Sequence, residues 1–205
     1  MLTIIITIIT VLISIASFNN SELFTRLSFI PYQIREKKQF ERFISHAFVH
    51  ADWVHLIVNM LVFFSFGRYV ESIFGALEDH GQIFSGTFFY AVLYFGGAVI
   101  ASLSSFIKHR NNPNYISVGA SGAVSAVLFT SIFFSPMEKI LFYGVIPMPG
   151  IVFGLLYLIY SSYMSRRSKD NINHDAHFWG AVFGLILPVL LYPASLQNFI
   201  NSIFR

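Results

Sequence analysis

The stretch of sequence that decides the fold reads SVGASGAVSA and runs from Ser117 to Ala126. It opens an apolar run that continues to Phe134 and is long enough to cross much of a lipid bilayer. Its first turns consist almost entirely of small residues, which membrane helices carry where a second helix must pack very close. One hydroxyl, that of Ser121, lies in the middle of this patch. Such patches and such serines usually serve packing alone, so a chemical role for Ser121 depends on the rest of the chain.

The composition is that of a polytopic membrane protein. Of the 205 residues, 55% are hydrophobic and only 11% are charged, whereas about 25% are charged in soluble domains. The absence of cysteine excludes disulfides, thiolate metal ligands and a cysteine nucleophile. The formal net charge of +3 is expected to reflect basic loops beside lipid headgroups, so we expect no nucleic-acid partner.

The apolar runs predict six membrane-spanning helices in a single domain that covers residues 1–205, with no separate soluble domain. The expected spans are residues 2–18, 53–70, 83–107, 115–135, 151–164 and 174–192. The first apolar run lacks a preceding basic residue and a small-residue cleavage site, so we interpret it as a span and not as a signal peptide. Pro147–Gly150 cannot continue a helix, which predicts an irregular start to the fifth span.

The first connection, residues 19–52, is long, polar and partly aromatic. A connection of this length is usually functional or contains secondary structure of its own. Its aromatic and aliphatic side chains predict that it lies against the membrane surface.

Six spans would put both chain ends on one side of the membrane, and spans two, four and six would all begin on the other side. Polar and ionisable residues inside spans are functional candidates by default, and the sequence places such residues at these three starts. His55 and Asn59 are four residues apart on one face of the second span. Ser121 lies early in the fourth span, and His177 lies in the first turn of the sixth.

The sixth span also carries a counterpart to the small-residue patch. Gly180 and Gly184 form a Gly-x-x-x-Gly pair, which lets another helix approach closely. Gly180 lies one turn beyond His177 on the same helix face. Packing this face against the patch of the fourth span would bring His177 to Ser121.

These residue types suit nucleophilic catalysis. A serine hydroxyl becomes an effective nucleophile when a base removes its proton, and histidine does this near neutral pH. The tetrahedral intermediate then needs donors for its oxyanion, which Asn59, His55 and the backbone N–H of Ser121 could supply. No acidic residue inside a span is positioned to orient His177, and Asp175 should point elsewhere on the helix. The pattern therefore predicts a Ser–His dyad and not a triad.

The motifs resemble those of the rhomboid intramembrane serine proteases, over about residues 42 to 188. The family's Gly-x-Ser-Gly is similar to Gly119-Ala120-Ser121-Gly122, and its Ala-His-x-x-Gly-x-x-x-Gly is similar to Ala176-His177…Gly180…Gly184. The His and Asn of its second span are similar to His55…Asn59, and its upstream histidines to His46 and His50. Its Gly-Arg…Glu pattern is similar to Gly67-Arg68…Glu71. One departure is Glu41-Arg42, where many bacterial relatives have Trp-Arg.

The resemblance implies a six-helix core that cleaves transmembrane substrates with a dyad of Ser121 as nucleophile and His177 as general base. It also implies an oxyanion site formed by His55, Asn59, the Ser121 backbone N–H and Gly119 of the serine motif. It would make the fifth span a mobile gate beside the active site. The simpler expectation for the aromatic residues of that span is that they face lipid; they are Phe153, Tyr157, Tyr160 and Tyr163.

A metal site is the alternative interpretation of the histidines. The spacing of His46, His50 and His55 is loose, no carboxylate or cysteine accompanies them, and His-Glu-x-x-His is absent. We therefore expect no metal and no cofactor, and we interpret His46 and His50 as loop anchors that bond to backbone.

Four further residues are expected to be structural. Gly180 and Gly184 would serve helix packing, and Arg68 would belong to the far end of the second span. Glu71 follows His55 by 16 residues, which places it about 24 Å further along the helix. It is therefore expected to be an anchor and not a catalytic acid.

The basic residues disagree with the resemblance about orientation. Ten of the 13 Lys and Arg residues lie in the first, third and fifth connections, and the positive-inside rule would put that face in the cytoplasm. The resemblance implies the reverse, with the catalytic face outward. Half of the ten lie in the long first connection, so we follow the resemblance and expect a multi-pass protein of the bacterial inner membrane.

The sequence thus predicts an intramembrane serine endopeptidase whose partners are the lipid bilayer and single-pass or polytopic membrane protein substrates. The alternative is a catalytically silent rhomboid-like protein that binds membrane helices for quality control. Loss of Ser121 or His177 would mark that alternative, and both are present. A transporter or channel would predict ionisable residues at mid-span and repeat symmetry, and the sequence shows neither.

Overall fold

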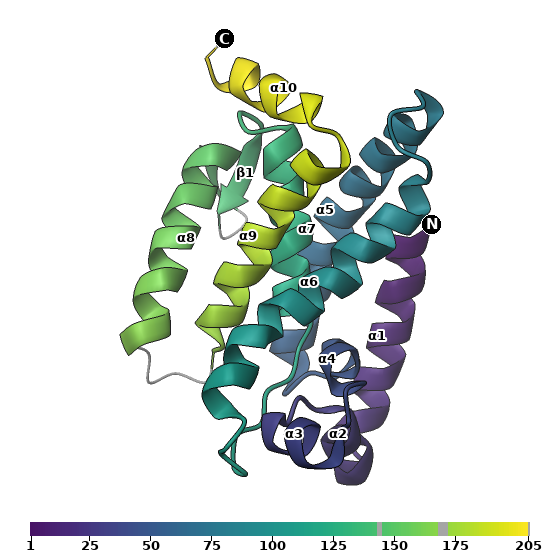
Figure 1. Ribbon diagram of the computed structural model, residues 1–205, viewed down its shortest axis with the longest axis vertical. Helices are drawn as coiled ribbons and strands as arrows, with labels where there is room; N and C mark the ends of the chain where they lie inside the picture. Colours follow the sequence, from purple (N-terminus) through teal and green to yellow (C-terminus); the bar gives the residue numbers. More distant parts are fainter. Residues whose placement is uncertain (143–144, 168–171, 205) are drawn as a thin grey trace.

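Helices form nearly all of the structure, a computed structural model that describes residues 1–142, 145–167 and 172–204 (Figure 1). In chain order the elements are α1 (Leu2–Phe18), α2 (Ser21–Leu27), α3 (Pro31–Lys37), α4 (Arg42–Ser45), the 3₁₀ turn η1 (His46–Phe48), α5 (Trp53–Asp79), α6 (Gly86–His109), α7 (Ser121–Phe134), β1 (Lys139–Phe142), β2 (Ile146–Pro149), α8 (Gly150–Arg167), α9 (His174–Leu191) and α10 (Ala194–Ile203).

Three helices of the described chain are long and apolar enough to cross a membrane. They are α5, α6 and α9, with mean hydropathies of 1.4, 1.7 and 1.3. Helices α1 and α7 are also apolar but shorter. The predicted all-α membrane bundle is thereby confirmed, whereas the number of six spans stays a prediction.

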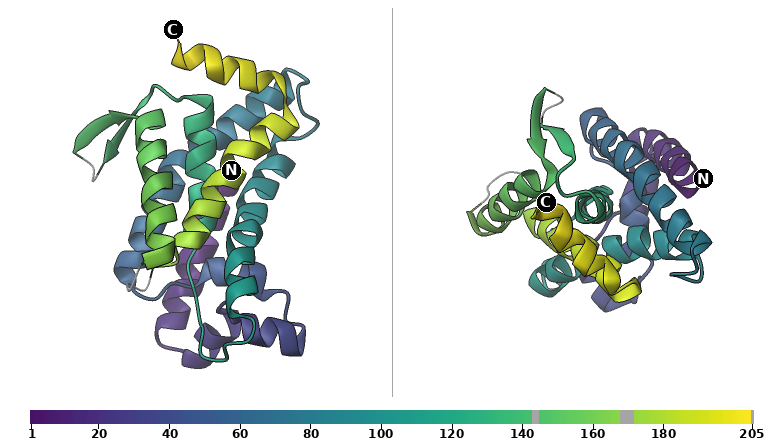
Figure 2. Two further views of the ribbon diagram at one scale, coloured as in Figure 1. Left: turned by 60° about the vertical axis from the view of Figure 1, so that its left-hand side comes forward. Right: turned by 90° about the horizontal axis from the view of Figure 1, so that it is seen from above.

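Helix α7 lies inside the bundle and packs against α5, α6 and α9. Every residue from Gly122 to Phe133 is buried, and the view from above shows the other helices around it (Figure 2). A helix that is apolar on all sides is one that is buried on all sides. Helices α5, α7 and α9 all begin toward the end of the bundle where α2, α3 and α4 lie (Figures 1 and 2).

The first connection folds into α2, α3, α4 and η1, which pack against α1 and α6. Arg42 organises this segment, a role that its charge alone does not predict. Its side chain is 4% exposed, and it donates hydrogen bonds to the carbonyl oxygens of Thr25 and Ser28 and to the amide oxygens of Gln33 and Gln39. A buried guanidinium with this many acceptors ties together chain segments that have no periodic pattern of their own.

Two predicted span boundaries differ most from those of the observed helices. Helix α5 does not stop at Val70 but continues to Asp79. Helix α7 begins at Ser121 and not at Tyr115, because Ser117 is held in an isolated bridge to Phe29. The irregular start predicted for the fifth span is an antiparallel pair of strands in which Lys139 lies opposite Pro149. These strands were not predicted from the sequence.

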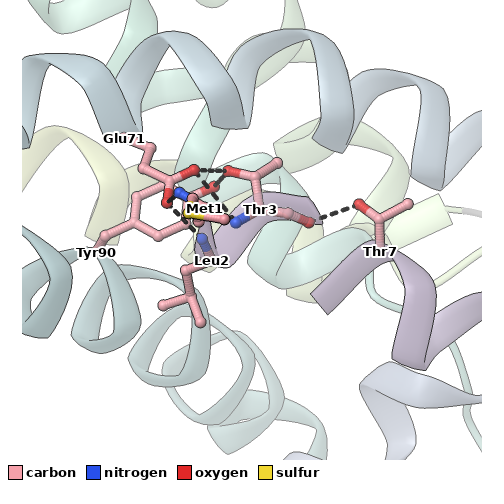
Figure 3. A network of polar contacts seen from close by, with 6 residues as sticks. All are labelled: Met1, Leu2, Thr3, Thr7, Glu71 and Tyr90. Atoms are coloured by element: carbon pink, nitrogen blue, oxygen red, sulfur yellow. Dashed lines mark hydrogen bonds and ion pairs between the residues drawn. The ribbon is translucent and has the colours of Figure 1, made fainter. Parts of the chain in front are cut away.

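Glu71 joins the start of α1 to α5 (Figure 3). Its carboxylate accepts hydrogen bonds from the backbone N–H groups of Leu2 and Thr3 and from the Thr3 hydroxyl, at 2.8 Å for the hydroxyl. The Thr3 oxygen in turn lies 2.7 Å from the Tyr90 hydroxyl on α6. The first N–H groups of a helix lack intrahelical acceptors, so a carboxylate there both caps α1 and locks three helices together.

Candidate active site

The six residues before α7 run in a non-helical path that leads directly to Ser121. Phe29 and Ser117 exchange two backbone hydrogen bonds, at 2.9 and 3.0 Å, and the Gly119 N–H donates to the His46 carbonyl at 3.0 Å. Gly119 has φ of 111°, a conformation that glycine adopts without steric cost. The first connection therefore sets the path of the backbone that delivers Ser121.

Ser121 is the first residue of α7, with Ala120 as the N-cap residue. The first hydrogen bond of the helix runs from the Val124 N–H to the Ala120 carbonyl at 2.9 Å. The N–H groups of the first turn therefore point out of the helix end, where the macrodipole also favours negative charge. An anion that forms beside the Ser121 hydroxyl would meet these groups.

His46 anchors the first connection. Its Nδ1 lies 2.9 Å from the Arg42 carbonyl, so that nitrogen carries the proton, and its ring packs against Phe29 with centroids 5.3 Å apart. Burial lowers the pKa of His46 to about 4, against the partial opposition of the Arg42 hydrogen bond. A neutral imidazole with a backbone acceptor is a structural contact.

His50 links α1 to the backbone beside Ser121. Its Nε2 accepts from the Ala120 N–H at 3.4 Å, and its Nδ1 lies 2.9 Å from the Ser14 hydroxyl oxygen. The Ser14 hydroxyl donates to the Phe48 carbonyl at 2.9 Å, so His50 must be the donor to Ser14 and is neutral. Burial, reinforced by the positive charge that His55 can carry, lowers the pKa of His50 to about 3, while Asp52 opposes this shift.

The low pKa of His50 predicts a pH-dependent stability. Below its ordinary pKa of about 6.5, the unfolded chain binds a proton that the folded chain refuses until about pH 3. This contribution is fully present above about pH 6.5 and is lost as the pH falls. The thermal midpoint in detergent should fall between pH 7 and pH 4, and fall less steeply in His50→Gln. His80→Gln, at an exposed histidine, should keep the wild-type slope, and an unchanged slope in His50→Gln would contradict the prediction.

Helix α5 brings His55 and Asn59 to the same place. The side chain of Asp52 caps the helix by accepting from the His55 N–H at 2.8 Å. The His55 ring lies against Gly119, where an added Cβ would come within 2.6 Å of Nε2. Asn59 lies one turn further, is 7% exposed and donates to the His55 carbonyl at 2.9 Å. That bond uses one of the two N–H groups of its amide and leaves the other for a ligand.

Helix α9 packs against α7 with almost no space between the backbones. A Cβ at Gly180 would overlap the Gly122 carbonyl, and one at Gly184 would overlap the carbonyl of Ala126. A Cβ at Gly122 would lie 3.5 Å from the Ala176 carbonyl oxygen. Small-residue seams of this kind let membrane helices gain close van der Waals contact.

This seam brings Ser121 and His177 to the same end of the bundle, because Ser121 precedes Gly122 and His177 follows Ala176. The Asn173 side chain starts α9 by accepting from the Ala176 N–H at 3.1 Å, and it donates to the Ser105 hydroxyl at 2.8 Å. Ser121 and His177 are both partly exposed, so water can approach them. Asp175 pairs with Lys108 on α6 and is thus directed to another partner.

The sequence interpretation is corrected at two residues of this region. The Gly119 N–H already donates to the His46 carbonyl, which argues against the predicted role of Gly119 as an oxyanion donor. Tyr157 does not face lipid, since its hydroxyl lies 2.7 Å from that of Ser125 and its ring lies beside His177. Tyr160 and Tyr163 are each 54% exposed, as expected for that helix. Arg68 is exposed, with its guanidinium 5.7 Å from the centre of the Phe64 ring.

Two cavities of about 330 and 340 Å³ lie at the other end of the bundle. The first is lined by residues of α5, α7 and α10, including Phe133 and Phe199, and the second by residues of α5, α7 and β1, including Ser135 and Lys139. Neither is lined by Ser121, His177, His55 or Asn59. Among the described residues, no group of three or more His, Asp or Glu side chains could hold a metal ion.

The sequence model of the Rhomboid domain family matches residues 37–194 of this chain. The rhomboid protease GlpG of Haemophilus influenzae is 24% identical over 189 residues, which cover 90% of this chain and 88% of that protein. Rhomboid-like protein 11, chloroplastic, of Arabidopsis thaliana is 30% identical over 162 residues, or 73% of this chain and 52% of the relative.

A second plant relative, RHOMBOID-like protein 12, mitochondrial, of Arabidopsis thaliana, is 27% identical over 158 residues, or 70% of this chain and 44% of the relative. The chain thus spans about half the length of these plant proteins, 44% and 52%. These three relatives are thus one bacterial protein and two plant proteins named as mitochondrial and chloroplastic.

Proposed function

Because this chain belongs to the rhomboid family, an integral-membrane family that includes serine proteases, we propose that it is a serine endopeptidase acting on membrane-protein substrates within the bilayer. The observation that carries the proposal is the position of Ser121. It is the first residue of a buried helix, at the seam with the start of α9 that carries His177. A serine that served only packing would not need to lie at a helix N-terminus with polar side chains at the same end of the bundle.

In the proposed reaction, His177 takes the proton of the Ser121 hydroxyl as the oxygen attacks the scissile carbonyl. The bond formed is the Ser121 ester, and the bond broken is the peptide C–N. His177 returns the proton to the leaving amine. A water molecule, deprotonated by His177, then attacks the ester carbonyl; the C–O bond to Ser121 breaks, His177 returns the proton to the Ser121 oxygen, and the carboxylate product is released.

The proposed oxyanion site has two parts. The N-terminal N–H groups of α7, that of Ser121 included, supply backbone donors on one side. The free amide N–H of Asn59 and the ring of His55 supply side-chain donors on the other. The neighbouring His50 and Gly119 hold the His55 ring, since the His50 and His55 centroids are 4.9 Å apart. Fixed donors of this kind stabilise the charge of the transition state without reorganisation.

Removal of the Asn59 amide tests the side-chain part of this site. In Asn59→Ala, kcat should fall by about 10²- to 10³-fold, because one oxyanion donor is worth that much. KM should change little, since the donor acts on the intermediate. Ser65→Ala is a matched control on the same helix, because the Ser65 hydroxyl donates to the Leu61 carbonyl of its own helix at 2.8 Å. Equal rates in the two variants would remove Asn59 from the mechanism.

The function itself is tested with the purified chain in liposomes that contain a quenched fluorescent transmembrane substrate. We expect cleavage within the hydrophobic segment, at small residues near helix-breaking ones, because a helical peptide bond is shielded until the helix unwinds. An intact substrate, together with a protein that binds it and is not labelled by a fluorophosphonate, would instead favour the silent helix-binding protein.

We further propose that the chain lies in a bacterial inner membrane with its catalytic face outward. Two basic residues on that face are engaged and are not free to bind lipid headgroups: Arg42 is buried and Lys108 pairs with Asp175. Lys169 lies outside the described residues. A reporter fused after Arg205 should read out in the cytoplasm, and a periplasmic readout would reverse the orientation.

A further inference from the structure

Two aromatic–histidine pairs join α8 to α9. The Tyr157 and His177 rings are 6.2 Å apart at 24°, and the Tyr160 and His174 rings are 5.5 Å apart at 81°. The two tyrosines are three residues apart and lie on one face of α8, and the two histidines are three residues apart on one face of α9. The two pairs are therefore expected where these faces pack against each other in antiparallel helices. Only the first pair involves the proposed general base.

The hydroxyl of Tyr157 reaches a third helix. It lies 2.7 Å from the Ser125 hydroxyl, and Ser125 is four residues after Ser121, on the same face of α7. The Tyr157 ring also packs against Phe129, with centroids 5.3 Å apart. The phenol is therefore fixed at both ends, with its hydroxyl on α7 and its ring face toward His177.

Helix α8 has few fully buried residues, although Phe153 and Leu158 also pack against the cluster around Phe129. Its buried residues are Gly150, Gly154 and Ser161, and apolar side chains such as Leu155 and Ile159 are about three-fifths exposed, at 60% and 58%. A Cβ at Gly154 would lie 3.3 Å from the Phe129 ring, so the close approach of α8 to α7 is centred one turn from Tyr157.

A dyad needs some group to orient its base. In a triad an acid does this by accepting from the second ring nitrogen; a ring packed against the imidazole, as Tyr157 is, also restrains its plane. We propose that Tyr157 is a positioning residue for His177: Ser125 fixes the phenol, and the phenol ring fixes the plane of the imidazole. The inference rests on the proposed function, and it makes the docking of α8 a condition of catalysis.

The test compares kcat, KM and the rate of fluorophosphonate labelling in the full chain in liposomes. The variants are Tyr157→Leu, Tyr157→Phe, Ser125→Ala and the double variant Tyr157→Phe/Ser125→Ala. Tyr163→Leu is the matched control, because Tyr163 is on the same helix and 54% exposed. The thermal midpoint of each variant is measured to verify that it folds.

Tyr157→Leu should lower kcat by about 10²-fold, the usual cost of misplacing a reacting group by about 1 Å. KM should stay within about twofold, and labelling should slow in parallel because the probe needs no transmembrane docking. Tyr157→Phe should give a kcat between those of wild type and Tyr157→Leu, since it keeps the ring but loses the hydroxyl that contacts Ser125. The double variant should be no slower than Ser125→Ala, because Tyr157→Phe and Ser125→Ala remove the same hydrogen bond.

The outcomes separate the two proposals. An active wild type in which Tyr157→Leu equals Tyr163→Leu overturns the positioning role alone. A rise in KM at constant kcat overturns it as well, because Tyr157 would then contact substrate. If Tyr157→Leu does not fold, an unchanged kcat in both Tyr157→Phe and Ser125→Ala overturns the role of the Ser125 bond. A folded wild type without labelling or cleavage overturns the proposed function, and the inference with it.

Discussion

Ser121→Ala is expected to abolish both substrate cleavage and fluorophosphonate labelling, with a loss of about 10⁴-fold or more. The variant removes the attacking oxygen, so no ester can form. His177→Ala should lose a similar factor, because the hydroxyl would then keep its proton. The double variant should be no slower than either single variant, since nucleophile and base act as one unit.

Ser131→Ala is the matched control for this prediction. Ser131 lies on the same helix and is buried, and its hydroxyl donates to the Leu128 carbonyl at 2.7 Å. Its removal should leave labelling unchanged, because the bond lies within one helix and far from the start of α7. Labelling that survives Ser121→Ala would show that another serine is the nucleophile. A folded wild type that is never labelled would contradict the protease.

Gly184→Ala is expected to destabilise the protein strongly. The new Cβ would overlap the Ala126 carbonyl, so α7 and α9 would have to separate along the seam that also positions His177. Overpacking of this kind costs about 3 kcal/mol, which exceeds the helix propensity of about 1 kcal/mol that alanine gains over glycine. We expect a lower thermal midpoint in detergent by about 5 °C or more, together with lost cleavage.

Gly75→Ala is the control for this seam. Gly75 is on α5, and an added Cβ there would have no heavy atom within 4 Å. That variant should melt at or slightly above the wild-type temperature, since only the propensity gain acts. Equal midpoints in Gly75→Ala and Gly184→Ala would mean that the helices can separate at no cost, and the close-packed seam would then have no energetic importance.

Several features of this protein follow from local patterns in the sequence. Transfer free energies add up along a short window, so the apolar runs predict a helical membrane bundle without any knowledge of contacts. Helix periodicity puts Asn59 one turn beyond His55 and Gly180 one turn beyond His177. Because these relations involve neighbours along one helix, the candidate residues and their faces could be predicted from the sequence.

Other features depend on contacts between residues far apart in the chain. The apolar pattern extends the fourth span back to Tyr115, yet the helix begins at Ser121 because Phe29 and His46 bond the backbone of the preceding residues. His50 bonds to Ala120, 70 residues away in the sequence, and the helical periodicity of the sequence does not predict such a bond. Arg42 carries a charge in the sequence, and only its buried acceptors make it a structural centre.

Tyr157 illustrates the same division. Its helix is identifiable from the sequence, but an aromatic residue at a membrane surface and one against a histidine have the same local pattern. Only the docking of α8 on α7 and α9 places its hydroxyl at Ser125 and its ring at His177. The sequence by itself determined the helices and the residue types that they carry. The tertiary structure decided where α7 starts and which side chains surround Ser121 and His177, because hydrogen bonds and ring contacts between distant segments have no local signature.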